Sequence, residues 1–161
     1  MKKLLMLFLM VLFSSLSAQD VLFDLELDQK KVDALDAWKR KPFKVIEADG
    51  KKCIYLKGKG GISVPVDFSK YIGKKFTIFA TIKYKDVPQT KKNWNGFKIA
   101  FLAKAGDGSY SGTQALYLGT SDWRTVKKTA APIKPGTGKG YVHIGTLGGE
   151  IWISELFIES E

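Results

Sequence analysis

The sequence of 161 residues contains little cysteine, histidine or arginine, and each shortage excludes a class of function. Cys53 and His143 are the only residues of their kinds. A lone cysteine excludes an internal disulfide, and with one histidine it cannot complete a zinc site. Arginine occurs only at Arg40 and Arg124. Because arginine is preferred for bidentate recognition of phosphate and guanine, the composition argues against nucleic acid as a partner.

The sequence also lacks the common patterns of catalytic residues. Glycoside hydrolysis generally needs two carboxylates on opposite sides of the scissile bond, and no acidic residues are spaced so as to aim a pair into one groove. No serine lies in a Gly-x-Ser-x-Gly turn, and the glycine-rich residues 58–61 lead into a predicted strand instead of a phosphate-binding helix. These absences favour a protein without catalysis of its own.

Long apolar runs are confined to the N-terminus. Two lysines precede the apolar run from Leu4 to Phe13, and small and polar residues follow. This order is typical of a secretory signal peptide, and the run is too short to span a membrane, which takes about 20 residues. We therefore predict a signal peptide over residues 1–18, with cleavage after Ala18 or alternatively after Ser17. The protein would then be secreted, to the periplasm or the cell exterior, without membrane insertion.

Removal of that segment leaves 24 basic and 16 acidic residues, a formal charge of +8. The excess is lysine scattered along the chain, which is typical of soluble proteins with protected sheet edges. Attraction to an anionic surface such as an acidic polysaccharide is the alternative. The segment from Cys53 to Leu56 has the pattern of a strand, which predicts a buried, inert thiol.

Residues 19–161 have the length of one domain, and no repeat or linker divides them. Strand-like alternation is clearest from Lys75 to Lys85, where Phe79 and Lys83 fall on the face opposite the mainly apolar one. Only Gln29 to Ala37 has a helical pattern. Short strands with frequent turns are typical of an all-β fold, and we predict a β-sandwich jelly roll. The predicted strands are 21–27, 38–47, 53–56, 61–66, 75–85, 97–103, 114–118, 123–131, 141–147 and 151–159. Gly148-Gly149 predicts a tight hairpin between the last two.

Five segments of this domain follow one another in a characteristic order. They are Asp49 to Leu56, Val66 to Ser69, Gly73 to Lys83, Trp123 to Val126 and Ile151 to Leu156. In this order they resemble the jelly-roll carbohydrate-binding modules appended to xylanases and glucanases, and the likeness covers most of the predicted domain. The resemblance implies a galactose-binding-like β-sandwich that binds a polysaccharide without catalysis, attached to or beside a glycoside hydrolase.

Acidic residues near the first and last strands suggest one further ligand. Asp24, Glu26 and Glu155 would share a structural calcium ion with backbone carbonyls, because calcium prefers oxygen ligands. Simple solvated acids are the alternative, and Ser154-Glu155 stands where the family has its closing acidic pair.

Aromatic residues number 20, and a ring outside the core can stack on the apolar face of a sugar. Trp94 lies in a polar segment between Asn93 and Asn95, whose amides would reach sugar hydroxyls. Tyr110 lies in a segment of glycine and serine. A plug over the edge of the sandwich is the alternative for both rings.

Strand alternation supplies the remaining candidates. Tyr117 alternates with Leu116 and Leu118 and is predicted to point away from the core, and His143 is predicted to face outward beside Tyr141. The predicted ligand-binding residues are Trp94, Asn93, Asn95, Tyr110, Tyr117, Phe79, Lys83 and His143. Trp38, Trp123 and Trp152 have apolar neighbours and are predicted to lie in the core.

Two other functions stay open at this point. A small polysaccharide lyase would use His143 with Tyr141 or Lys83. A cell-surface adhesion or protein-interaction domain would use Trp94 and Tyr110 as anchors.

Overall fold

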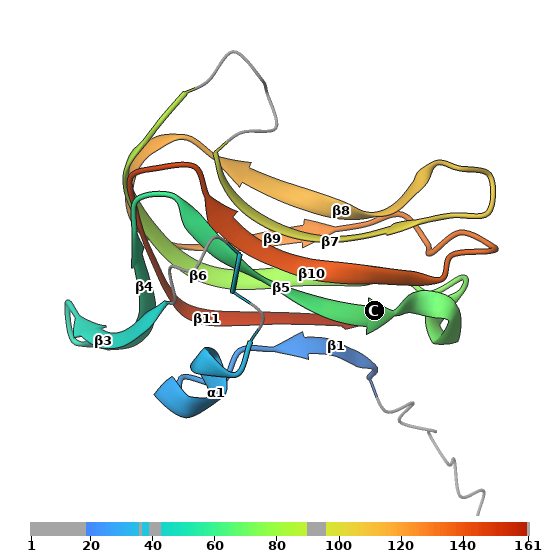
Figure 1. The fold of residues 1–161 in the computed structure, drawn as a ribbon, viewed down its shortest axis with the longest axis horizontal. Coiled ribbons are helices and arrows are strands. Elements are labelled where there is room, and N and C mark those ends of the chain that lie inside the picture. Colours follow the sequence, from blue (N-terminus) through green and yellow to red (C-terminus); the bar gives the residue numbers. More distant parts are fainter. Residues whose placement is uncertain (1–18, 36, 39–42, 90–95, 161) are drawn as a thin grey trace, which may run out of the picture.

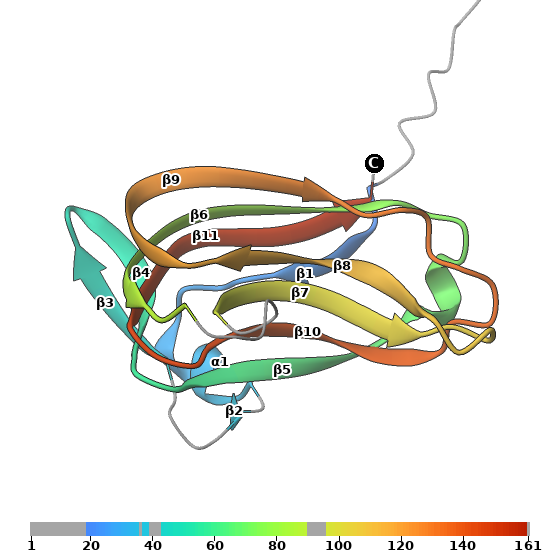
Figure 2. The same ribbon diagram turned by 90° about the horizontal axis from the view of Figure 1, so that it is seen from above.

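The computed structural model describes residues 19–35, 37–38, 43–89 and 96–160, which form two antiparallel sheets packed face to face (Figures 1 and 2). The predicted signal peptide lies outside the described residues. Sheet A consists of β1 (Val21–Asp24), β3 (Lys44–Ala48), β4 (Lys51–Lys57), β6 (Phe76–Val87), β9 (Gly119–Thr129) and β11 (Glu150–Ser160). Sheet B consists of β2 (Ala37–Trp38), β5 (Gly60–Asp67), β7 (Phe97–Lys104), β8 (Tyr110–Tyr117) and β10 (Lys139–Thr146). The predicted all-β sandwich is therefore confirmed.

The order of strands in space differs from their order in sequence. Sheet A runs β3-β4-β11-β6-β9, with β1 also paired to β11, and sheet B runs β2-β5-β10-β7-β8. Figure 1 shows β5, β10, β7 and β8 side by side, and Figure 2 shows them in one layer with β9, β6 and β11 in the other. The last two strands are thus central in their sheets and join distant parts of the chain.

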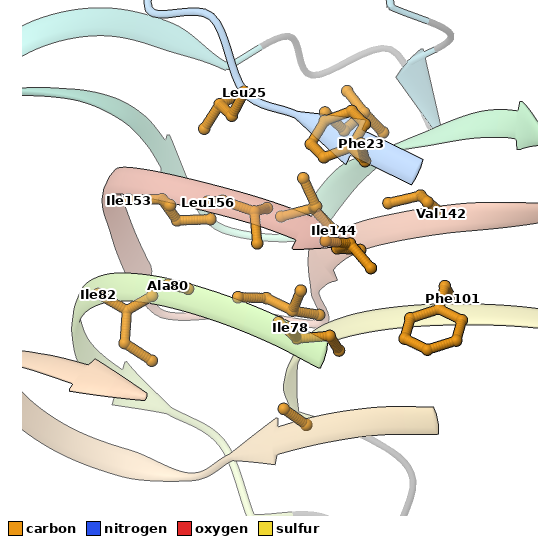
Figure 3. Close-up of a cluster of buried hydrophobic side chains, with 14 of the residues drawn as sticks. Phe23, Leu25, Ile78, Ala80, Ile82, Phe101, Val142, Ile144, Ile153 and Leu156 are labelled. Carbon is orange, nitrogen blue, oxygen red and sulfur yellow. The ribbon is translucent and has the colours of Figure 1, made fainter. Parts of the chain in front are cut away.

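The core lies between the sheets and is built from alternate residues of each strand. Ile78 and Ile153 of sheet A and Phe101 and Ile144 of sheet B are fully buried in one cluster (Figure 3). Burial of each such side chain stabilises the fold by about 1.5–3 kcal/mol. Cys53 is also fully buried, as predicted, and burial raises the pKa of its thiol.

The short helical elements agree with local sequence signals. The helix α1 (Gln29–Asp33) lies within the range that the sequence predicts, and its N-cap residue Asp28 accepts hydrogen bonds from the backbone N–H groups of Lys30 and Lys31. The 3-10 helix η1 (Phe68–Tyr71) begins after Asp67, which caps it in the same way through Ser69 N.

Two predictions about strand connections are wrong. Gly148-Gly149 does not close a hairpin, because β10 belongs to sheet B and β11 to sheet A, so the turn crosses between the layers. A glycine pair indicates that the chain reverses its direction, but it does not indicate whether the two strands that it joins pair with each other. The predicted strand 38–47 is likewise two strands, β2 and β3, in different sheets.

Candidate functional site

Sheet B presents an outer face made of the residues that alternate with its core residues. On β10, Val142 and Ile144 are buried, so Tyr141 and His143 point outward. The same alternation applies on β5, β7 and β8. We define the sheet B face by six outward side chains: Ser63, Lys98, Leu102, Gln114, Tyr141 and His143.

Strand register brings these residues together from distant parts of the chain. His143 lies between Ser63 on β5 and Ala100 on β7, and Ala100 lies opposite Gln114 on β8. Tyr141 lies opposite Leu102 in the neighbouring row. The face therefore combines an aromatic ring and an apolar side chain with several hydrogen-bonding groups.

In the next row toward the other end, the positions on β5 and β10 are both glycine. Gly61 faces Gly145 there, and a Cβ atom on Gly61 would lie 2.4 Å from the carbonyl oxygen of Ile144. The backbones of β5 and β10 approach each other so closely here that both positions require glycine. These glycines thus have a structural cause, and they are not in themselves a sign of a ligand.

His143 is held by its neighbours on this face. Its Nδ1 atom lies 2.9 Å from the hydroxyl oxygen of Ser63, and its ring meets the ring of Tyr141 edge to face, with centroids 6.4 Å apart. Burial, with a smaller contribution from the charge of Lys98, lowers the pKa of His143 to about 4. The imidazole is therefore neutral at physiological pH.

Three other polar groups of the sheet B face form no contact of this kind within the part of the chain that the structure describes. Within the described residues, the amide of Gln114, the hydroxyl of Tyr141 and the ammonium of Lys98 form no side-chain hydrogen bond and no ion pair. Tyr141 is 41% exposed, whereas Gln114 and Lys98 are half-buried. These groups are free to bind a ligand.

The outer face of sheet A is also aromatic, but its polar groups bond to one another. We define the sheet A face by Tyr55, Phe79, Lys83, Trp123, Trp152 and Phe157. Asp49 accepts hydrogen bonds at Oδ2 from Lys83 Nζ (2.8 Å) and from Trp123 Nε1 (2.9 Å). Lys83 also lies 3.4 Å from Asp122. The ammonium of Lys83 is the first cause that lowers the pKa of Asp49, and the indole of Trp123 is the second.

The rings of the sheet A face pack against one another in two pairs. Tyr55 and Trp152 have centroids 5.1 Å apart, and Phe79 stacks on Phe157 at 4.9 Å. The Tyr55 hydroxyl donates to Glu150 at 2.5 Å, and burial is the main cause that raises the pKa of Tyr55 to about 12. This face therefore stabilises itself through ring contacts and ion pairs.

The structure divides the predicted ligand residues between the two faces. Phe79 and Lys83 face outward as predicted, on sheet A, and His143 faces outward as predicted, on sheet B. Tyr110 begins β8, is 65% exposed and falls on the same side of that strand as Gln114. Trp94, Asn93 and Asn95 lie outside the described residues.

Tyr117 does not point away from the core, and that prediction is wrong. It is 9% exposed and packs against Phe97 and Tyr84, with ring centroids 5.4 and 5.7 Å away. The reason is that Leu116 and Leu118 are the outward residues of this segment. The sequence pattern was misleading because Leu116 and Leu118, although apolar, lie on the outer side, and Tyr117 lies in the core.

Trp123 and Trp152 are the opposite error, because both are half-buried on the sheet A face instead of in the core. On β11 the apolar neighbours of Trp152, Ile151 and Ile153, are the buried residues instead. The side chain of Trp38 is not among those described.

The residues of the sheet B face that the sequence did not predict are Ser63, Lys98 and Gln114. Alternation with Ile99 would have placed Lys98 outward, but the meeting of Ser63 and Gln114 with His143 depends on register.

The described residues offer no support for the predicted calcium ligands. Within them, no three His, Cys, Asp or Glu side chains come together in a way that could hold a metal ion. Glu26 pairs with Lys31, and Glu155 accepts a hydrogen bond from Thr81. Asp24, Glu26 and Glu155 therefore do not form a ligand set in this part of the chain, and calcium binding stays a prediction.

No family model and no curated protein sequence matches the chain. Solved structures do match. The xylan-binding domain CBM22-1 of Paenibacillus barcinonensis Xyn10C is 13% identical with a TM-score of 0.52, over 89% of this chain and 96% of that one. A family 16 carbohydrate-binding module is 13% identical with a TM-score of 0.54, over 74% and 86%. The C-terminal family 22 module of Clostridium thermocellum Xyn10B is 10% identical with a TM-score of 0.54, over 87% and 92%.

The chain has the fold of a jelly-roll carbohydrate-binding module. The resemblance predicted from the five sequence segments is thereby confirmed at the level of the fold. Among the described residues, no helix has both the length and the apolar character needed to cross a membrane.

Proposed function

We propose that this chain is a secreted, non-catalytic module that binds a polysaccharide on the sheet B face. The observation that carries the proposal is the exposed ring of Tyr141 on the same face as Gln114 and Lys98, whose side chains form no hydrogen bond or ion pair within the described residues. A pyranose ring has apolar faces and a rim of hydroxyl groups. It therefore suits a face that carries an aromatic ring together with amide, hydroxyl and ammonium groups, each of which can donate a hydrogen bond.

The fold neighbours support the same conclusion. One of them is a xylan-binding domain. Another is the C-terminal family 22 carbohydrate-binding module of Xyn10B, in which amino acids of the cleft have a role in ligand binding. Their likeness to this chain concerns the fold, so the binding function of the chain rests on the composition of the sheet B face.

The side chains of the sheet B face argue against catalytic cleavage of the polysaccharide. A glycosidase would need two carboxylates around one bond, and the only carboxylate among the outward positions of β5, β7, β8 and β10 is Asp67. A lyase would use His143 as a base beside Tyr141. A histidine with a pKa of about 4 is a weak proton acceptor at neutral pH.

Such a module would act beside a glycoside hydrolase, as a separate partner or an attached domain. It would hold the polysaccharide near that enzyme and so raise the local concentration of substrate. Export through the predicted signal peptide would bring the module to polysaccharides outside the cytoplasm.

Affinity gel electrophoresis with the purified protein tests the proposal. We expect retardation by at least one polysaccharide in a panel of xylans, glucans, galactans and uronate-containing chains, relative to a gel without polysaccharide. The same mixtures should release neither reducing nor unsaturated ends. Steady product formation, or unchanged mobility with every polysaccharide of the panel, would contradict the proposal.

A further inference from the structure

The charges on the outer side of sheet B are mostly positive. Among the outward positions of β5, β7, β8 and β10, the charged side chains are Lys98, Lys104, Lys139 and Asp67. Asp67 is already engaged, because its Oδ1 atom accepts hydrogen bonds from the backbone N–H and the hydroxyl of Ser69. The carboxylate caps η1 and lies opposite Lys139 on β10, so the acid of this face is not a partner of Lys98.

Lys98 differs from the other lysines of this face because it is half-buried, whereas Lys104 and Lys139 are exposed at strand ends. It forms no ion pair within the described residues. The covered part of such a lysine is its apolar stem, and the ammonium stays available to an anionic partner. Lys83 on the sheet A face, which is 28% exposed, has such partners in Asp49 and Asp122.

Among the described residues, the strand neighbours of Lys98 leave its charge uncompensated. His143 is the nearest titratable group of the face, and its lowered pKa keeps the imidazole neutral at physiological pH. Gly145 and Leu116 are the direct neighbours of Lys98 in the adjacent strands, and neither carries charge. Among these described neighbours, a ligand would meet the positive charge of Lys98 beside apolar and small residues.

Building on the proposed function, we infer that the polysaccharide is anionic and that one of its acidic groups binds the ammonium of Lys98. The acidic group is a uronate carboxylate or a sulfate ester, because both present oxygen acceptors to an ammonium donor. The missing partner of Lys98 is then supplied by the ligand.

Lys98 and Tyr141 would contact different sugars of the same chain. Tyr141 is four residues from Gly145, the residue opposite Lys98, and a strand rises about 3.3 Å per residue, so the two positions lie about 13 Å apart. Substitutions at the two sites should therefore have independent, additive effects on affinity.

Matched pairs of polysaccharides that differ only or mainly in charge provide the test. The pairs are polygalacturonate with its methyl ester, glucuronoxylan with unsubstituted xylan, and carrageenan with agarose. We expect the acidic member of at least one pair to bind about tenfold more tightly, and less tightly as salt rises. The first two pairs probe a carboxylate and the third probes a sulfate.

Two variants locate the charge effect. Lys98→Gln should abolish the preference for the acidic member, so that the affinities of the acidic and the neutral member become equal within about twofold. Lys127→Gln is the matched control, because Lys127 is an exposed lysine beside Phe79 on the opposite sheet, and it should leave the preference unchanged. Circular dichroism would show that both variants are folded.

The outcomes separate this inference from the proposed function. Binding without preference for acidic members, or a preference that survives Lys98→Gln, would overturn the inference and leave polysaccharide binding intact. Absence of binding to every member would overturn both. A preference lost in Lys98→Gln and kept in Lys127→Gln would support it.

Discussion

Lys83 on the sheet A face bonds to Asp49 and Asp122, whereas Lys98 on the sheet B face has no partner within the described residues. The same contrast holds for the other polar groups. Trp123 Nε1 donates to Asp49, but the amide of Gln114 forms no side-chain hydrogen bond in the part of the chain that the structure describes.

The difference shows that aromatic content alone does not identify a binding face. The sheet A face has more aromatic rings, yet they stack on one another and their polar edges are already bonded. A ligand would have to replace these bonds before it gained its own, and each exchange of a satisfied hydrogen bond brings little net free energy. On the sheet B face the first hydrogen bonds to a ligand replace only water.

The largest expected effect is a loss of stability, and it tests which side of β8 faces the core and which belongs to the outer face of sheet B. Tyr117→Ala should lower the free energy of unfolding by about 3–5 kcal/mol, because it removes a buried ring from the core. Leu116→Ala, the neighbouring outward position, should cost less than about 1 kcal/mol. Urea unfolding of both variants is the measurement. An equal or larger loss for Leu116→Ala would mean that β8 presents its other side to the core.

The second prediction concerns the pH dependence of the sheet B face. The pKa of His143 falls from an ordinary value of 6.5 to about 4 on folding, so between these values the unfolded chain binds more protons. Stability should therefore fall as pH decreases from 6.5 to about 4, by at most about 3 kcal/mol from this residue, with no further loss below. In His143→Asn this part of the loss should disappear. Unfolding curves at pH 7 and at about pH 4.5 compare the two proteins, and an equal loss in both would contradict the assignment.

The smallest effect belongs to the sheet A face and has a lower pH window. Bonds from Lys83 and Trp123 lower the pKa of Asp49 below its ordinary value of 3.8. Its contribution to stability is therefore present above that value and is lost as pH falls through the lower, folded-state pKa. Asp49→Asn should melt at a lower temperature than the wild type at neutral pH, and the two should converge in acid. A difference in melting temperature that does not change with pH would show that charge is not its cause.

Much of the fold could be predicted from sequence because strand periodicity is a local property. Alternation placed Phe79, Lys83 and His143 on outer faces correctly. It failed for Tyr117 and Trp152, where apolar residues occur on both sides of the strand. In such segments only the packing of the opposite sheet decides which residue is buried.

The candidate site was less predictable because it depends on register. Ser63 and His143 are 80 residues apart in sequence and meet through the pairing of β5 with β10. Ala100 and Gln114 enter the same row through β7 and β8. No local pattern indicates which of the strands become neighbours, and the crossing at Gly148-Gly149 shows how a local turn signal can suggest the wrong pairing.

The most direct test of the account is a comparison of affinity between Tyr141→Ala on the sheet B face and Trp152→Ala on the sheet A face. Stacking of one aromatic ring is worth about 1–3 kcal/mol, so Tyr141→Ala should weaken polysaccharide binding roughly 5- to 150-fold with little change in melting temperature. Trp152→Ala should lower the melting temperature, because its ring packs on Tyr55, and leave the affinity of the folded protein within about twofold of the wild type. The opposite result, affinity lost in Trp152→Ala and kept in Tyr141→Ala, would place the binding site on sheet A and contradict the account.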